Sequence, residues 1–321
     1  MTNTILITGA SGYVGGFTLK RLKQPDVASK LPGATLRGLV RNPRDFGKLT
    51  LAGAQPVQGD VTNIDSLHKA LEGVDQVVHL AAVNRDKGDV TMERVNAQGT
   101  INLVEAAKAA GVRHIINLVG LGADSKRPYP LAHTQGRGVE YMIASNIPYT
   151  ILEASVIFGP GDEFINTLAG LARVPPVMIV PGDGKTKFQP IAVTDVADCL
   201  VQSLWRQEVV NKRLQICGSQ IVTLEDIIDA ILSELRLGRI KLHMPVPVLK
   251  LGVGLMDVTL PKPPVTPSLL AQLGVDNIAT DNATERVFGI KPAQLRDGIG
   301  FVQDMTLGRL IARTLGRADY Q

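Results

Sequence analysis

The sequence predicts an α/β protein built on a doubly wound parallel sheet, with a smaller mixed region towards the carboxyl end. Three observations favour this fold: short apolar runs alternate with helical patterns through the first half, the first run ends in a glycine-rich turn, and prolines interrupt the second half. We expect residues 1–157 to form the core and residues 158–321 the mixed region, with parts at about 188–217 returning to the core sheet.

The first strand follows the run Thr4–Thr8 and breaks into a turn with glycines three residues apart, before an amphipathic helix from Val14 to Leu22. Such a turn needs one glycine for left-handed backbone, one for close approach to a pyrophosphate and one for helix-on-strand packing. The helix supplies N–H groups and a positive dipole end. We predict a dinucleotide site in a Rossmann core rather than a turn without ligand. Its expected residues are Gly9, Ser11, Gly12, Tyr13, Val14 and Gly15.

The later strands and helix ends follow in order along the first half. The strands are expected at Leu36–Val40, around Val57, at Val74–Leu80, at Val112–Val119 and within Ile147–Ile157. Asn42 is expected to cap a helix, and Gly111 to end one. Thr62 with Asp65 three residues later resembles a capping box.

The second half contains one clear helix and one apolar segment for which several roles are considered. Thr223 opens an amphipathic helix that Gly238 ends. Residues 245–260 are apolar apart from Lys250 and Asp257. We favour a packed core helix followed by a loop, with a hydrophobic lid, a partner-docking surface or a peripheral membrane contact as alternatives.

Composition excludes several classes of function. The 34 basic and 30 acidic residues are spread along the chain, which argues against a nucleic-acid partner. Cys199 and Cys217 lack metal-ligand spacing, so we expect two buried small side chains and no metal site. The sequence has no apolar run of the roughly 18 residues that a membrane span needs. We expect a cytoplasmic protein, or one peripheral on the cytoplasmic or matrix side of a membrane complex.

The end of the second strand indicates which dinucleotide binds. An acid there pairs with the ribose 2′-OH of NAD, whereas an arginine accommodates the 2′-phosphate of NADP. Here Arg37 and Arg41 flank Leu39-Val40, and Arg44 follows. A guanidinium suits a phosphate, so we predict NADP(H) over NAD(H), with a solvated Arg41 as the alternative. Four further residues are placed beside the cofactor by position: Asp60, Val61, Ala81 and Ala82.

Several stretches together resemble a known family. They read ITGASGYVG, LVRNP, GDVTN, VVHLAA, VNAQGTINLVEAAKAAGVRHIINL, TILEASVIFGPGDEFIN and FQPIAVTDVAD. They resemble the extended and atypical short-chain dehydrogenase/reductases, the NAD-dependent epimerase/dehydratase group, over residues 4 to about 200, and more weakly to FGIKPAQLRDGI. The IFGPGDEFIN and FQPIAVTDVAD stretches look most like the nucleotide-binding accessory subunit of respiratory complex I and its bacterial relatives.

The resemblance implies a serine after the fifth strand and a Tyr-x-x-x-Lys on the next helix as catalytic groups. The serine position falls on Val119-Gly120, where Val119 would line the cofactor instead. Counting back from Pro148, the tyrosine position falls on Leu131 and the lysine on Gln135. Neither side chain can supply the family's proton transfer.

Three other residues are the candidate catalytic groups. Tyr129 and His133 have the right spacing, with histidine for lysine, although Pro130 favours a helix's first turn and His133 is expected to face solvent there. Glu153 replaces part of the Leu-Arg-Pro common in the family, and is either an acid/base group or the partner of a nearby Arg or Lys.

Two functions from different classes follow. In the first, the chain binds NADP(H) without dehydrogenase turnover and uses it structurally or in a respiratory-type complex with a protein partner. In the second, it is an NAD(P)-dependent oxidoreductase or epimerase/dehydratase acting on a hydrophobic carbonyl, a quinone or a sugar nucleotide. A cofactor-reading regulator is a third class, which no residue selects.

Overall fold

The computed structural model describes residues 3–317, apart from the side chains at positions 257, 268 and 272, and it divides into two compact units. The first unit comprises Met1–Ala154, Val193–Ile216 and Asp281–Ile290. The second unit comprises Ser155–Ala192, Cys217–Thr280 and Lys291–Gln321. The chain therefore leaves the first unit and returns to it twice.

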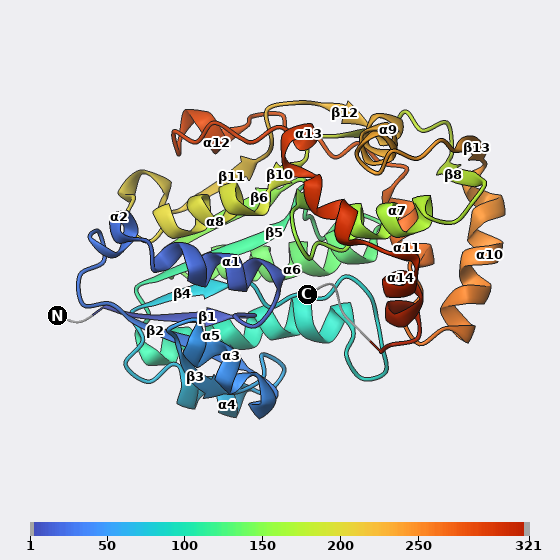
Figure 1. Ribbon diagram of the computed structural model, residues 1–321. Helices are drawn as coiled ribbons and strands as arrows, with labels where there is room; N and C mark the ends of the chain where they lie inside the picture. Colours follow the sequence, from blue (N-terminus) through green and yellow to red (C-terminus); the bar gives the residue numbers. More distant parts are fainter. Residues whose placement is uncertain (1–2, 318–321) are drawn as a thin grey trace. The chain divides into compact units, whose positions relative to one another are not determined.

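A seven-stranded parallel sheet forms the centre of the first unit, in the order β11-β6-β5-β4-β1-β2-β3 (Figure 1). Its strands are β1 (Thr4–Thr8), β2 (Thr35–Val40), β3 (Gln55–Gln58), β4 (Gln76–His79), β5 (His114–Gly120), β6 (Tyr149–Ala154) and β11 (Lys212–Ile216). The chain runs outwards from β1 to β3 and starts again with β4 on the other side of β1. This reversal makes a switch point beyond the carboxyl ends of β1 and β4, where open α/β sheets bind ligands. The expected doubly wound parallel sheet is confirmed.

Helices cover both faces of this sheet. Helices α1 and α8 pack together on one face, and α4, α5 and α6 pack side by side on the other (Figure 1). The helical segments are α1 (Tyr13–Leu22), α2 (Pro25–Ala28), η1 (Pro43–Asp45), α3 (Phe46–Leu51), α4 (Ile64–Ala70), η2 (Glu93–Gln98), α5 (Gly99–Ala110), α6 (Pro130–Ala144), α8 (Val193–Gln202), η3 (Gln207–Val209) and α12 (Ala283–Arg286).

The helix ends test the expected caps. The Asn42 side chain accepts a hydrogen bond from the Arg44 N–H, and Gly111 ends α5 in the left-handed region at φ +72°, so both expectations are confirmed. The capping box at Thr62 is wrong. Asn63 caps α4 instead, because the Thr62 hydroxyl donates to the Asp60 carboxylate.

The second unit contains several short strand pairs and a helical core. Its elements are β7 (Ile157–Phe158), α7 (Phe164–Ala172), β8 (Val177–Pro181), β9 (Lys187–Phe188), β10 (Ile191–Ala192), β12 (Val222–Thr223), α9 (Leu224–Glu234), β13 (Ile240–Met244), α10 (Val246–Thr259), α11 (Pro267–Gln272), α13 (Leu295–Gly298), η4 (Gly300–Asp304) and α14 (Leu307–Thr314). Thr223 caps α9 as expected, in a reciprocal pair with Asp226. The apolar stripe of α9, with Ile227, Ile228 and Ile231, packs into the core of this unit.

The expectation of a packed core helix over residues 245–260 is wrong for most of α10. Val253 is buried, but Val248, Leu251, Leu255 and Val258 are exposed. Among the described helices, none is long and apolar enough to cross a bilayer.

Buried titratable groups lie in both units. His114 on β5 lies 2.9 Å through Nε2 from the Thr150 hydroxyl, which donates to the Val209 carbonyl, so the ring must donate its Nε2 proton to Thr150. Burial lowers the pKa of His114 to about 4. In the second unit, the Asp162 carboxylate accepts the Ile165 N–H at 2.6 Å, and burial raises the pKa of Asp162 to about 7.

His114 predicts acid sensitivity. The unfolded chain binds a proton near pH 6.5 and the folded chain only near pH 4, so this group's stabilisation is present above pH 6.5 and is lost as the pH falls to about 4. The loss amounts to about 3 kcal/mol. His114→Gln should therefore show a shallower fall of the unfolding free energy across this window, as measured by urea denaturation.

The exposed His68 of α4 provides the matched control. His68→Gln should keep the wild-type slope. Asp162 has the opposite sign, because its raised pKa stabilises the fold at low pH and that contribution is lost as the pH rises to about 7. The comparison is consequently made between variants at each pH, and equal slopes for His114→Gln and wild type would contradict the prediction.

Candidate dinucleotide site

The glycine turn after β1 has the geometry that a dinucleotide requires. Gly9 has φ +66°, and the Gly12 N–H donates to the Gly9 carbonyl at 2.9 Å, which closes the turn. A Cβ on Gly9 would lie 2.8 Å from the Leu80 carbonyl carbon and 2.9 Å from the Ala81 nitrogen. Gly9 is therefore required both by its backbone conformation and by the end of β4 packed against it.

The other two glycines have different tasks. A Cβ on Gly15 would lie 2.3 Å from the Gly9 carbonyl oxygen, so α1 packs directly on the turn's own backbone. Gly12 is exposed and is the N-cap of α1 in extended backbone. Gly12 accordingly leaves bare backbone exposed at the start of α1, while Gly9 and Gly15 shape the turn.

The amino end of α1 is suited to an anion. Its cap makes no side-chain hydrogen bond, and its first turn, from Tyr13, holds no acidic residue. The N–H groups of this turn therefore point at the space beyond Ser11 and Gly12 together with the positive end of the helix dipole. Ser11, Tyr13 and Val14 are each partly exposed around this end.

A buried polar chain behind the turn was missed by sequence reasoning. The Thr8 hydroxyl accepts the N–H groups of Leu80 and Ala81 at 3.1 and 3.2 Å and lies 2.7 Å from His79 Nδ1. His79 Nε2 lies 3.0 Å from the Thr100 hydroxyl, which donates to a carbonyl of η2. His79 must donate from Nε2 and accept at Nδ1, because the Thr100 hydroxyl already donates its proton to the carbonyl of η2.

His79 is held neutral by its surroundings. It is 2% exposed, and burial lowers the pKa of its ring to about 4. The buried series of hydrogen bonds continues to Asn96. Its side chain accepts the Val83 N–H and donates to the Val83 carbonyl, both at 2.8 Å. The signal in the sequence was a histidine inside an apolar strand, followed by an asparagine before a helix. Ala81 and Ala82 lie on the segment after β4 that these hydrogen bonds hold in place.

The two arginines expected beside the cofactor have different surroundings. Arg41 follows directly after β2 and is exposed. Arg37 lies three residues before the end of β2, and its guanidinium donates to the Glu72 carbonyl at 2.6 Å. The structure therefore directs Arg37 to the end of α4 and leaves Arg41 at the carboxyl edge.

Asp60 and Val61 lie beyond β3 at the same edge. The Asp60 carboxylate accepts the Thr62 N–H at 2.8 Å and the Thr62 hydroxyl at 2.9 Å, which fixes this loop. Val61 is buried, and the Asn102 side chain donates to its carbonyl at 3.0 Å. The Val61 side chain is therefore in the core, and its carbonyl is held by Asn102.

Gln135, the position where the resemblance implies a lysine, joins a helix to a strand end. The Gln135 side-chain oxygen accepts the Gly120 N–H at 2.9 Å, which joins α6 to the end of β5. Val119 is 6% exposed and packs in the core of the first unit. Gln135 and Val119 thus hold the strand end in place and carry no group that titrates near neutral pH.

Tyr129 and His133 lie together at the start of α6. Tyr129 is the N-cap residue, and Pro130 begins the first turn as its sequence position favours. The expectation that His133 faces solvent is wrong, because its Nδ1 hydrogen-bonds the Ser125 carbonyl. A carbonyl accepts only, so Nδ1 carries the proton and Nε2 keeps its lone pair.

Glu153 takes the second of its two expected roles. It is 3% exposed, lies beside Val119 in the β5–β6 register, and forms an ion pair with Arg213 of β11. Arg213 also donates to the Ala123 carbonyl. The pair therefore fixes the loop after β5. Within residues 3–317, no three His, Cys, Asp or Glu side chains gather as a metal site would need.

Comparison with known proteins agrees with this geometry. A family described as NAD(P)H-binding matches residues 9–206. The 40 kDa subunit of mitochondrial NADH-ubiquinone oxidoreductase from Neurospora crassa is 22% identical over 297 residues, which cover 91% of this chain and 76% of that protein. The NAD(P)H azoreductase of Xenophilus azovorans is 26% identical over 230 residues, covering 71% of this chain and 72% of that protein.

Solved structures share the fold. The NADPH-dependent quinone oxidoreductase QOR2 of Escherichia coli, complexed with NADPH, has a TM-score of 0.73 at 21% identity, with 91% of this chain and 97% of that chain covered. A UDP-glucuronic acid 4-epimerase from Bacillus cereus has a TM-score of 0.71 at 20% identity, with 94% and 98% covered. The chain belongs to the NAD(P)H-binding family, whose model matches more than half of its length.

Proposed function

We propose that this chain holds NADP(H) as a structural component and does not carry out the family's usual hydride transfer. The observation that carries the proposal is the Gln135 amide tied to the Gly120 N–H, beside an intact glycine turn. The reduced cofactor needs a proton donor or acceptor near the reacting carbon for carbonyl chemistry. Leu131 and Gln135 cannot supply one.

Arg41 supports the preference for NADP(H). It is the exposed arginine that directly follows β2, where a 2′-phosphate lies in this fold. A guanidinium forms two parallel hydrogen bonds to a phosphate, whereas a carboxylate at this place would repel it. NAD(H) lacks that phosphate and would gain nothing from Arg41.

A cofactor that does not react still stabilises its protein. A ligand that binds only the folded state adds RT ln(1 + [L]/Kd) to the unfolding free energy, which is about 2.7 kcal/mol at a hundredfold excess over Kd. NADP(H) would hold together the ends of β1, β2 and β4, which contribute the turn, Arg41 and Ala81. The cofactor would thereby keep a rigid unit available for assembly.

The setting we propose is a respiratory-type complex with a protein partner. The relative from Neurospora crassa, named as a subunit of NADH-ubiquinone oxidoreductase, spans 91% of this chain. Attachment would be peripheral, on the cytoplasmic or matrix side, with residues 245–260 at the membrane surface. The exposed apolar side chains of α10 support that placement.

A reductase acting on a hydrophobic carbonyl, quinone or sugar nucleotide is the second candidate. His133 favours it, because the Ser125 carbonyl fixes the proton on Nδ1 and leaves Nε2 able to accept one. Tyr129, one helical turn away at the cap of α6, would be its proton-transfer partner. Glu153 is engaged by Arg213 and would act only through that pair.

Cofactor preference can be tested at Arg41. We expect wild-type protein to bind NADPH more tightly than NADH by fluorescence titration. Arg41→Glu should weaken NADPH binding by about a hundredfold, since an attractive charge becomes repulsive, and leave NADH nearly unchanged. Lys108→Glu, which reverses an exposed charge in the last turn of α5, is the control and should change little. Equal wild-type affinities for the two cofactors would overturn the preference.

Turnover can be tested on the bound cofactor. Single-turnover mixing of the NADPH complex with quinones, azo dyes and aldehydes should leave the NADPH absorbance unchanged, while NADPH raises the melting temperature. Tyr129→Phe and His133→Gln should retain full NADPH affinity. Oxidation that falls more than about tenfold in either variant would establish the reductase instead.

The setting can be tested in the native cell. Tagged protein isolated in mild detergent should run on native gels at the size of a large complex and bring respiratory subunits with it. A monomer with no stable companion in membranes and extract alike would refute assembly while leaving cofactor binding intact.

A further inference from the structure

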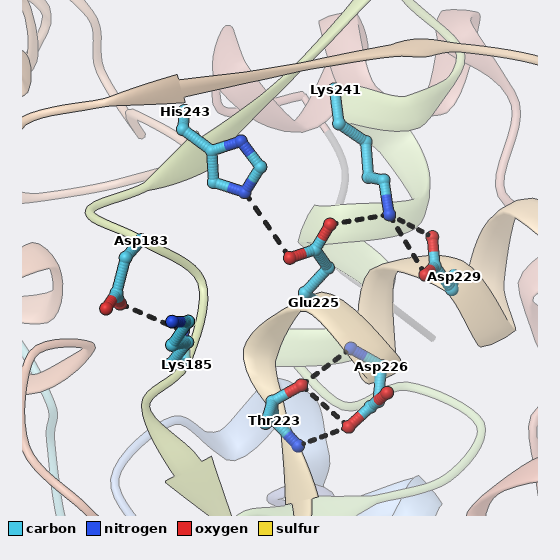
Figure 2. Close-up of polar contacts among 8 residues, drawn as sticks. All are labelled: Asp183, Lys185, Thr223, Glu225, Asp226, Asp229, Lys241 and His243. Atoms are coloured by element: carbon cyan, nitrogen blue, oxygen red, sulfur yellow. Dashed lines mark hydrogen bonds and ion pairs between the residues drawn. The ribbon is translucent and has the colours of Figure 1, made fainter.

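Lys241 and His243 of β13 lie on the side of the β8–β13 sheet that faces helix α9. Lys241 Nζ lies 2.6 Å from a Glu225 carboxylate oxygen and 3.0 Å from an Asp229 oxygen, and His243 Nε2 lies 3.4 Å from Glu225 (Figure 2). These ion pairs compensate the positive charge of Lys241 and hold β13 against α9. They also fix which side of the strand faces the protein.

The opposite face of the same sheet is apolar and uncovered within the described chain. Side chains alternate along a strand, so Ile240 and Leu242 point away from Lys241 and His243. In the parallel register Leu242 pairs with Ile179 of β8. Ile240 is 69%, Leu242 47% and Ile179 44% exposed. On β8 the inner face holds the buried Met178 and Val180, so it is on β13 that apolar side chains face outwards and charged ones face α9.

Helix α10 follows β13 directly and continues this apolar character. Val248, Leu251, Leu255 and Val258 recur at helical spacing and form one stripe, with Leu251 79% and Val258 87% exposed. Val253, on the far side of the helix, is the residue buried against the protein. We call the stripe and the three sheet residues together the apolar surface. Strand β13 and helix α10 are neighbours at the right of Figure 1.

Charge around the apolar surface selects the occupant. From Leu235 to Gly274 the sequence has five basic residues and one acidic residue, Asp257. The basic residues are Arg236, Arg239, Lys241, Lys250 and Lys262. Arg236 and Lys250 are exposed. Lys241 is paired with Glu225 and Asp229, whereas Lys250 lies exposed on α10 itself. Exposed apolar side chains with such a cation on the same helix are complementary to a bilayer surface with anionic headgroups.

The dimensions indicate that such a segment lies on the membrane and does not cross it. Helix α10 has 14 residues, a length of about 21 Å, which is shorter than the roughly 30 Å hydrocarbon core. An amphipathic segment of this kind lies in the interface plane with its apolar side among the upper acyl chains.

We propose that the apolar surface is a docking site for an anionic lipid bilayer, formed by the outward face of the β8–β13 sheet together with α10. The sheet is part of the site because Lys241 is held against α9, which leaves Ile240 and Leu242 on the exposed side of the strand. The proposal rests on the peripheral attachment proposed above, to which it adds the sheet face and the anionic lipid class, and it does not depend on bound NADP(H).

Vesicle flotation tests the proposal on the full chain. Wild-type protein should float with vesicles of phosphatidylcholine mixed with phosphatidylserine, and much less with phosphatidylcholine alone. High salt should reduce binding, because it screens the basic flank. Leu251→Ser/Val258→Ser and, separately, Ile240→Ser/Leu242→Ser should each lower the bound fraction at least about tenfold. Lys250→Glu should lower binding to the anionic vesicles only.

The matched control is Leu51→Ser, which removes an 85% exposed leucine from α3 in the other unit and should float like wild type. NADPH titration of every variant checks that the fold and the cofactor site are intact, so loss of flotation with retained NADPH binding assigns the defect to the surface. Equal flotation of all variants, or none by wild type, overturns the proposal. So does a concentration-dependent dimer in ultracentrifugation that the same serine variants abolish, because a second copy would then cover the surface.

Discussion

The first unit depends on the close approach of two backbones, at Gly9 and at the Leu80–Ala81 peptide. A side chain at Gly9 would overlap this peptide, so the turn after β1 and the segment after β4 can meet only if that position is bare. The Thr8 hydroxyl joins the same two segments by accepting both N–H groups of the Leu80–Ala81 segment. His79 stays neutral so that the Thr8 proton has an acceptor. The switch point of the sheet is therefore built from backbone contacts reinforced by a buried polar chain.

Two buried side chains near the carboxyl ends of β5 and β6 serve the scaffold. Gln135 joins α6 to β5 through an amide. Glu153, beside Val119, is bound to Arg213. Together these contacts hold the loop between β5 and α6 at both of its ends.

Local requirements were readable from the sequence, and long-range ones were not. The glycine turn, the Asn42 cap and the Gly111 helix end follow from backbone conformations that few residues adopt. The choice of Asn63 over Thr62 as a cap depended on Asp60 engaging the threonine hydroxyl. The direction of Arg37 depended on where α4 ends. Helix α10 had an apolar composition that fits a buried helix equally well, so only the packed structure distinguished its exposed stripe.

The ion pair between Glu153 and Arg213 has a consequence for synthesis on the ribosome. When residue 154 has emerged, β6 is the outer strand of an unfinished sheet, with its edge groups unpaired until β11 is translated. The Glu153 carboxylate also lacks its counterion, Arg213, until β11 is made, and Ser155–Ala192 of the other unit are translated before then. A nascent chain in this state exposes a strand edge that can pair with other chains. The sheet of the first unit is therefore completed only after the segment between β6 and β11 has been made.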